Sequence, residues 1–238
     1  PWLFAVCALM AHDLSAQVLA FPPAEGWGRF SKGGRGGDVY IVTNLNDDGE
    51  GSLRYGIANA PGPRTIVFEV GGSIMVQSQI GILKNFITIA GLTAPGDGIQ
   101  VAGKGVAIGD NMHDIIIRYI RSREGKLLPA LAAKHSFNIN IGCENIIFDH
   151  CSAEFGRDET FSMEGNNTTV QWCIVAWGLE THSCGSLLRG KSVTVHHTLW
   201  AHNQTRNPKS TGDMLDWVNN VNFDWSIPFI AGDFQSSD

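Results

Sequence analysis

The feature that most constrains the fold is a short pattern that recurs along the chain at intervals of 21 to 31 residues. Each copy is an alternating, mostly β-branched run with Asn, Gly or Asp close by, which is typical of a strand and a turn. Self-similarity at this period indicates a stack of repeats. The anchors of the repeat are Phe68, Ile89, Ile117, Phe148, Val170, Val195 and Val218.

Repeats that contain strands and show no helical period predict an all-β fold, a right-handed parallel β-helix. Neighbouring strands lie about 4.8 Å apart, so residues that follow equivalent anchors should stack. The predicted ladder on one face consists of Arg118, Asp149, Gln171, His196 and Asn219. A leucine-rich repeat is disfavoured because no Leu-x-x-Leu-x-Leu consensus occurs, whereas a β-sandwich remains an alternative.

Two neighbouring stretches carry opposite charge. Residues 144–164 contain six acids and one arginine, whereas residues 189–209 contain four cations, three histidines and no acid. If the repeat brings them side by side, a cation site lies next to an anion site. A metal ion that bridges to an acidic substrate would fit between them.

Composition and the two ends of the chain limit the remaining options. A net charge of −6 argues against general nucleic-acid affinity. Residues 2–11 are apolar but too few to span a bilayer, and Val18-Leu19-Ala20 is a candidate cleavage site. We therefore interpret residues 1–20 as the remnant of a secretory signal peptide and residues 21–238 as one domain. A buried N-terminal cap helix is the alternative, and the chain ends within the repeats, which suggests a truncated solenoid.

The cysteines predict no disulfide framework. Cys151 and Cys173 occupy equivalent positions of consecutive repeats and should stack as small apolar side chains, with a disulfide as the alternative. No Cys-x-x-Cys or His-x-x-x-His spacing indicates zinc.

Several ordered blocks resemble the pectate lyase superfamily, of the polysaccharide lyase family 1 type. The early blocks are the glycine-rich loop 33–37, expected to lead into a strand at 39–43, then Val42-Thr43-Asn44-Leu45, Gly51-Ser52-Leu53-Arg54 and Thr65-Ile66-Val67-Phe68. The later blocks are residues 148–152, 158–160, 185–189 and 196–208. The resemblance covers about residues 26–226. It implies a parallel β-helix and the calcium-dependent, eliminative cleavage of polygalacturonate in plant cell-wall pectin. The expected enzyme is secreted, monomeric and of bacterial type.

The resemblance also implies roles for individual residues. Elimination removes the C5 proton of a galacturonate beside its carboxylate, so positive charge must stabilise the developing anion. Asp149 matches the first calcium-binding aspartate, and Asp158 the next acid, with Glu159 as a further candidate ligand. Arg206 matches the arginine that takes the proton. The residues expected to bind substrate are Arg189, His196 and Lys209.

An arginine base is chemically demanding, because a guanidinium has a pKa above about 12. Neighbouring cations and calcium would have to favour its neutral form, which predicts an alkaline activity optimum. A carboxylate clamp and a plain surface residue are the alternatives for Arg206.

Where the family often has a further acid, this sequence has Ser162, or Met163 if Glu159 takes the middle position. The expected calcium ligand set is therefore incomplete, with Glu159 or Glu154 as possible substitutes. Two other functions remain open. One is a non-catalytic β-helix that binds acidic polysaccharide. The other is a hydrolase of the polygalacturonase type, which needs paired carboxylates as acid and base, and the sequence lacks the tight Asp-Asp pairing and the accompanying Arg-x-Lys block.

Overall fold

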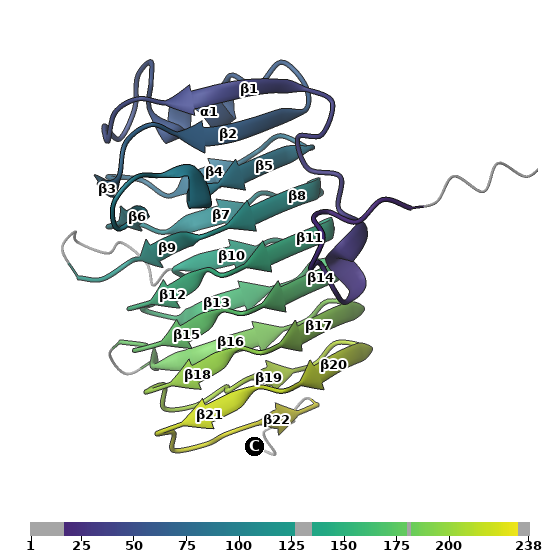
Figure 1. The fold of residues 1–238 in the computed structure, drawn as a ribbon. Helices are drawn as coiled ribbons and strands as arrows, with labels where there is room; N and C mark the ends of the chain where they lie inside the picture. The colour runs from purple at the N-terminus through teal and green to yellow at the C-terminus, as the bar shows by residue number, and fades with distance from the viewer. Residues whose placement is uncertain (1–16, 127–134, 180–181, 233–238) are drawn as a thin grey trace, which may run out of the picture.

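The computed structural model describes residues 17–126, 135–179 and 182–232. Their strands form three parallel sheets, and after the first two strands, which pair in one sheet, successive strands of the chain pass from one sheet to the next (Figure 1). The result is a β-solenoid in which each later turn adds one strand to each sheet. The predicted all-β parallel β-helix is thereby confirmed.

We name the sheets A, B and C in the order in which the chain visits them. Sheet A contains β1 (Asp38–Val42), β2 (Arg64–Phe68), β5 (Ile87–Ala90), β8 (His113–Arg118), β11 (Glu144–Asp149), β14 (Asn166–Gln171), β17 (Ser192–His196) and β20 (Met214–Val218). Sheet B contains β3 (Gly72–Met75), β6 (Ile99–Ala102), β9 (Ile120–Arg123), β12 (Ser152–Glu154), β15 (Ile174–Ala176), β18 (Leu199–Ala201) and β21 (Val221–Phe223). Sheet C contains β4 (Ile80–Ile82), β7 (Val106–Ile108), β10 (Phe137–Ile139), β13 (Glu159–Met163), β16 (Cys184–Leu188), β19 (Lys209–Ser210) and β22 (Ile230–Ala231). The short helices are η1 (Trp27–Phe30), α1 (Leu53–Ala58) and η2 (Gly91–Thr93).

The core lies inside the solenoid and consists of stacked rows of apolar side chains. The row in sheet A runs through Ile66, Ile89, Ile117, Phe148, Val170 and Val195. Each of these side chains is at most 2% exposed, and burying one contributes about 1.5–3 kcal/mol. Five of the seven predicted anchors therefore lie in one row.

Two anchors are wrong in register. Ile66, not Phe68, pairs with Ile89, and Trp217, not Val218, pairs with Val195. In strands a shift of one residue moves a side chain to the opposite face, and a shift of two keeps the face but changes the partner. Spacing along the sequence does not reveal such shifts, because the corners between sheets differ in length from turn to turn.

The predicted ladder in sheet A is confirmed for four members and wrong for the fifth. Arg118, Asp149, Gln171 and His196 are aligned in register, but Val218 follows them in place of Asn219. Asn219 comes after β20 and adopts a left-handed backbone with φ 52°, so it belongs to the corner.

The corner between sheets A and B is occupied in successive turns by a residue with left-handed backbone. Tyr119, His150, Trp172 and His197 have φ values of 56°, 53°, 54° and 51°. Their rings stack along the solenoid, with centroids 4.7, 6.1 and 4.1 Å apart. The stack places His150 and His197 beside, and not within, the polar ladder of sheet A.

Cys151 and Cys173 stack in the core as predicted. Both are buried, the Cys151 amide N lies 3.4 Å from the Cys173 Sγ, and both thiols are free. The disulfide alternative is therefore wrong. Among the described residues, Cys143 and Cys184 are also free, while Cys7 lies outside them.

Residues 17–37, which we call the strap, cross the outside of sheet A before the chain enters β1 (Figure 1). Side chains of sheet A hold its backbone: Thr169 Oγ1 accepts from the Gly28 amide at 2.9 Å, and Thr194 Oγ1 accepts from Trp27 at 3.2 Å. A Cβ at Gly28 would lie 2.2 Å from the Ile146 carbonyl oxygen, so only glycine permits this close approach. The strap is thus fixed to the sheet.

The predicted signal remnant falls largely outside the described residues, which begin at 17, so the boundary at residue 20 stays a prediction. The glycine-rich loop does lead into β1, one residue earlier than expected. Within the described part of the chain, no helix has the length and apolar character needed to cross a membrane.

Candidate active site

A pocket of about 280 Å³ opens on sheet C and collects ionisable side chains from four turns of the solenoid. Its lining consists of His135, Asp158, Glu159, Ser162, Glu164, Leu187, Arg189 and Arg206. Phe161 and Met163 belong to the core, so strand alternation directs Ser162 between them to the outside. The acidic and basic stretches of the sequence therefore do meet, as predicted, and they meet on sheet C.

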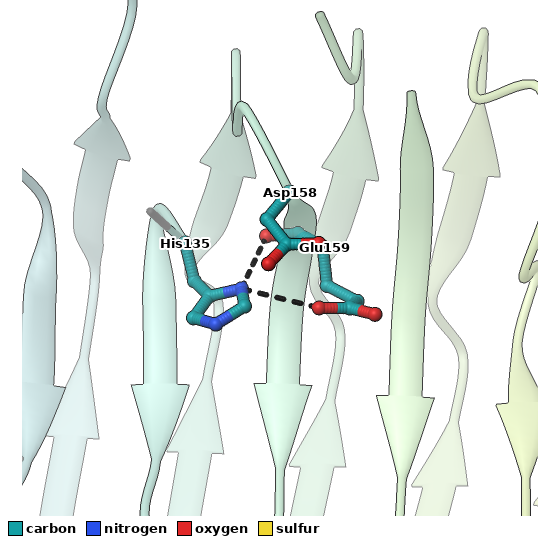
Figure 2. Close-up of side chains that lie close together, drawn as sticks. All are labelled: His135, Asp158 and Glu159. Carbon is teal, nitrogen blue, oxygen red and sulfur yellow. Dashed lines mark hydrogen bonds and ion pairs between the residues drawn. The ribbon is translucent and has the colours of Figure 1, made fainter. Parts of the chain in front are cut away.

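Two acids and a histidine form the acidic end of this sheet-C pocket. Asp158 directly precedes β13 and Glu159 begins it, while His135 lies two residues before β10 (Figure 2). One ligand atom from each of the three lies within 4.8 Å of the others. His135 Nδ1 is 3.0 Å from the Glu159 carbonyl oxygen and 3.4 Å from its Oε2. Glu159 is only 4% exposed, so its carboxylate depends on these neighbours.

Sequence reasoning missed His135. The signal that could have found it is the register of sheet C, where Phe137 pairs with Phe161. Counting back two residues from each partner places His135 beside Glu159. The repeat anchors lie in sheet A, and they carry no information on the register of sheet C.

Arg206 forms the basic end of the pocket next to the acids. Its Nη1 donates to Glu159 Oε1, and its side chain is 27% exposed. The residue has left-handed backbone with φ 56°, and its carbonyl accepts from the Ser186 amide at 2.7 Å. A Cβ at Gly185 would lie 2.6 Å from that carbonyl, so a glycine is needed for this approach. Tertiary contacts thus hold Arg206 in a conformation that costs free energy for a non-glycine residue.

Arg189 and Lys209 extend the positive charge along sheet C. Arg189 follows β16 and donates from Nη1 to Glu164 Oε1 at 3.1 Å, while half of its side chain stays exposed. Lys209 pairs with Leu187, which pairs with Ser162, so the three share one outward row. The sheet-C pocket is therefore lined by four of the seven residues singled out in the sequence, and a fifth, Lys209, lies next to its lining residue Leu187.

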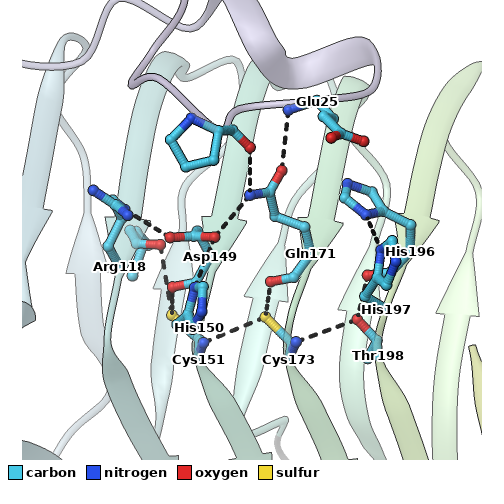
Figure 3. A network of polar contacts seen from close by, with 12 residues as sticks. Glu25, Arg118, Asp149, His150, Cys151, Gln171, Cys173, His196, His197 and Thr198 are labelled. Atoms are coloured by element: carbon cyan, nitrogen blue, oxygen red, sulfur yellow. Dashed lines mark hydrogen bonds and ion pairs between the residues drawn. The ribbon is translucent and has the colours of Figure 1, made fainter.

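The other two, Asp149 and His196, do not join the pocket. Both belong to sheet A and lie beneath the strap (Figure 3). Asp149 is fully buried, and its oxygens contact Arg118 Nε at 2.7 Å, Gln171 Nε2 at 2.7 Å and His150 Nδ1 at 2.9 Å. The roles implied by the resemblance would put Asp149 and Arg206 in one active site. The structure places them apart, because Asp149 ends a strand of sheet A beneath the strap and Arg206 precedes β19 of sheet C.

His196 is also buried, with 3% exposed, and faces the strap. Its Nδ1 is 2.8 Å from His197 Nδ1, and its Nε2 has no hydrogen-bond partner. Burial lowers the pKa of His196, while Glu25 and Asp149 nearby act in the opposite direction. His196 therefore packs as a neutral side chain between the strap and sheet A.

A pH-dependent stability follows. The pKa of His196 is lower in the folded protein than the ordinary value of 6.5. The unfolded chain therefore binds the proton more readily, and the free energy of unfolding should fall as pH drops below about 6.5. Denaturant unfolding at pH 7 and pH 5 measures the loss, which should be smaller in His196→Asn. An equal loss in both proteins would contradict this role, and His202→Asn, at a histidine paired with exposed Asp224, is the matched control.

The fold and the pocket define a class of protein: a parallel β-solenoid with carboxylates and guanidinium groups side by side on one sheet. No protein-family model matches the chain. Curated relatives named "Probable pectate lyase C" are 47% identical over 97% of the chain in Aspergillus terreus and 48% identical over 91% in Emericella nidulans. "Pectate lyase 5" of Ambrosia artemisiifolia is 32% identical over 54% of the chain. The chain is therefore a homologue of the pectate lyases, and the resemblance predicted from the ordered blocks is confirmed.

The chain spans about half the length of the curated relatives it matches, 54% for the Aspergillus terreus protein and 51% for that of Emericella nidulans. These relatives are fungal, so the expected bacterial type has no support from them. Two solved structures share the fold. One is jun a 1, the major allergen from cedar pollen, with a TM-score of 0.61 and 14% identity over 90% of this chain and 85% of that chain. The other is pectate lyase Bsp165PelA from Bacillus sp. N165 in complex with trigalacturonate, with a TM-score of 0.56 and 19% identity over 86% and 69%.

Proposed function

We propose that the protein cleaves polygalacturonate by β-elimination, and that the reaction takes place in the sheet-C pocket. The observation that carries this proposal is the direct contact of opposite charges there. Asp158 and Glu159 lie beside Arg206, with Arg189 in the same lining. A substrate with a carboxylate on every sugar needs such a site, because cations must neutralise it where charge develops. Homology to pectate lyases supports the same assignment.

The guanidinium groups have separate tasks in this proposal. Half of the Arg189 side chain is exposed, which is more than for Arg206. Arg189 is therefore suited to hold a substrate carboxylate through the donors of its guanidinium group. Lys209 offers a point charge further along the same sheet. Arg206, held in one conformation, is placed to take the C5 proton. Its Nη1 is occupied by the ion pair with Glu159, so Arg206 can reach the C5 proton only after Glu159 turns away.

The residues present fit a calcium ion in part. Asp158 and Glu159 supply the hard carboxylate oxygens that calcium prefers, but His135 supplies a nitrogen, and calcium takes six to eight oxygen ligands. Ser162 lines the pocket without adding charge. We therefore propose that Asp158 and Glu159 would hold the ion, and that water and substrate carboxylates complete its ligands. When bound, the ion would supply Lewis-acid stabilisation of the negative charge beside C5.

An assay with and without calcium tests the function. Full-length protein is incubated with polygalacturonate, and the ultraviolet absorbance of the unsaturated product is followed together with reducing ends. A calcium-dependent rise in absorbance supports the lyase. New reducing ends without absorbance would identify a hydrolase, and substrate binding with neither signal would identify a binding protein. We also propose that the protein is secreted, that it is monomeric and that its substrate is the pectin of plant cell walls.

The calcium ligands can be tested separately from the base. Glu159→Gln removes one negative charge from the pocket, and we expect the calcium concentration for half-maximal rate to rise about tenfold or more. Asp158→Asn should act in the same direction. Glu144→Gln, at an exposed acid of sheet A, is the control of equal charge change. An unaltered calcium requirement in Glu159→Gln, in protein whose melting temperature shows that it is folded, would remove Glu159 from the ligand set.

A further inference from the structure

A second and larger pocket of about 790 Å³ lies between the strap and sheet A. Its lining shares no residue with the sheet-C pocket. The residues that matter for its chemistry are Trp27, Arg29, Lys32, Arg35, Asn145 and Asn167. We call this pocket the strap groove, and we propose that it is a second binding site for an acidic oligosaccharide, separate from the site of cleavage.

Charge is the first argument. Arg29, Lys32 and Arg35 follow one another at intervals of three residues, are all exposed, and all line the groove. The whole chain carries a net charge of −6, so three cations in one pocket are a local concentration of positive charge. The one acid in the lining, Asp114, is 6% exposed, and its two oxygens accept from the Lys32 amide and contact His113 Nδ1, each at 2.9 Å. The groove therefore attracts anions.

The other lining groups indicate a sugar. Trp27 is 38% exposed and offers an apolar ring face beside the cations, and such faces pack on sugar rings. Asn145 and Asn167 lie in consecutive turns, and Asn167 Nδ2 donates to Asn145 Oδ1 at 3.3 Å. Each amide has a second polar atom that this bond does not use, and hydroxyl groups can bond to it. Cations, an aromatic face and amides together match a chain of sugar carboxylates better than a nucleic acid, which the negative net charge disfavours.

The groove is also preformed. Trp27, Gly28 and Lys32 donate their backbone N–H groups to Thr194, Thr169 and Asp114 of sheet A at 3.2, 2.9 and 2.9 Å. The Arg29 guanidinium carbon lies 4.4 Å from the centroid of the Phe30 ring and its Nη1 donates to the Gly26 carbonyl at 2.9 Å. A ligand therefore need not order the backbone, which lowers the entropic cost of binding.

The choice of galacturonate as the sugar rests on the function proposed above, so the test must separate the two. Protein with Arg206→Ala, which prevents turnover, is mixed with a galacturonate oligomer of defined length, and hydrogen exchange is measured over residues 26–36. We expect slower exchange there when the oligomer is present. When Arg29→Gln and Lys32→Gln are both added to this protein, the apparent affinity of the strap groove for the oligomer should fall about tenfold or more. Added salt should weaken this binding further.

Lys104→Gln makes the same kind of charge change between β6 and β7, outside the lining of the strap groove, and should leave the affinity measured at the strap unchanged. Trp27→Ala keeps all three cations and should also weaken binding. Cleavage of a short oligomer by the Arg29→Gln, Lys32→Gln protein should proceed at the wild-type rate.

Three results would overturn the proposal: unchanged exchange in the strap, unchanged affinity in the double variant, or single-stranded nucleic acid bound as tightly as the oligomer. Failure of the proposed function gives a different signature, because the wild-type protein then forms no unsaturated product whether or not the strap is protected.

Discussion

Replacing Arg206 by alanine should lower the rate of unsaturated-product formation by about a thousandfold or more. Proton transfer by a positioned side chain contributes about 10²–10⁴-fold, and removing a group that stabilises developing charge costs a similar factor. Arg206 serves both tasks in the proposed mechanism, and its backbone is held by contacts to β16. The measurement is kcat with polygalacturonate at saturating calcium, with substrate binding determined in parallel.

Arg206→Lys separates charge from geometry. A lysine keeps the positive charge but loses the planar fork, so we expect most of the rate to be lost in this variant as well. Arg189→Ala should instead raise KM more than it lowers kcat, because Arg189 is assigned to substrate binding. Lys84→Ala, at an exposed lysine between β4 and β5 and outside the lining of the sheet-C pocket, is the control. Wild-type turnover in folded Arg206→Ala protein would reject the assignment of the base.

Removing Asp149 should be the most destabilising of the changes considered, with little effect on chemistry. The carboxylate is fully buried, and Arg118, its main partner, is only 19% exposed at the side chain. Asp149→Ala therefore leaves a largely buried guanidinium without its counter-ion, which costs about 3–5 kcal/mol in comparable cases. Denaturant unfolding measures this loss.

The same change should loosen the strap. Asp149 Oδ1 accepts from Gln171 Nε2, and Gln171 in turn donates to the Pro23 carbonyl at 3.1 Å and accepts from the Glu25 amide at 3.1 Å (Figure 3). The Arg118 guanidinium carbon also lies 3.8 Å from the centroid of the Phe21 ring. Hydrogen exchange over residues 21–26 should therefore become faster in Asp149→Ala.

Asp149→Asn keeps the shape and removes only the charge, so its loss of stability should be smaller. If Asp149 were a calcium ligand, as the resemblance implied, either variant would raise the calcium requirement in folded protein. We expect the calcium requirement to stay at the wild-type value.

The opposite charges of the two central stretches were visible in the sequence, and the structure does bring their members together. Glu159 and Arg206 are 47 residues apart and form an ion pair. The sequence analysis took Asp149, in the ladder that begins with Arg118, as the first metal ligand, whereas this ion pair lies on sheet C. The ladder is regular for four members. Its regularity reflects attachment of the strap, whereas the pocket is lined by residues within, just before and just after the strands of sheet C.

The sequence by itself determined the solenoid and the kinship with pectate lyases. A repeated apolar run is a local property, and stacking the runs is the way in which each turn buries its inner face. Only the tertiary structure decided in which sheet, and on which face of that sheet, each polar side chain lies. The corners between sheets vary in length, and one extra residue moves a side chain to the other side of its strand. For this reason Asp149 became a buried support of the strap, while His135, which no sequence pattern singled out, lies beside Glu159.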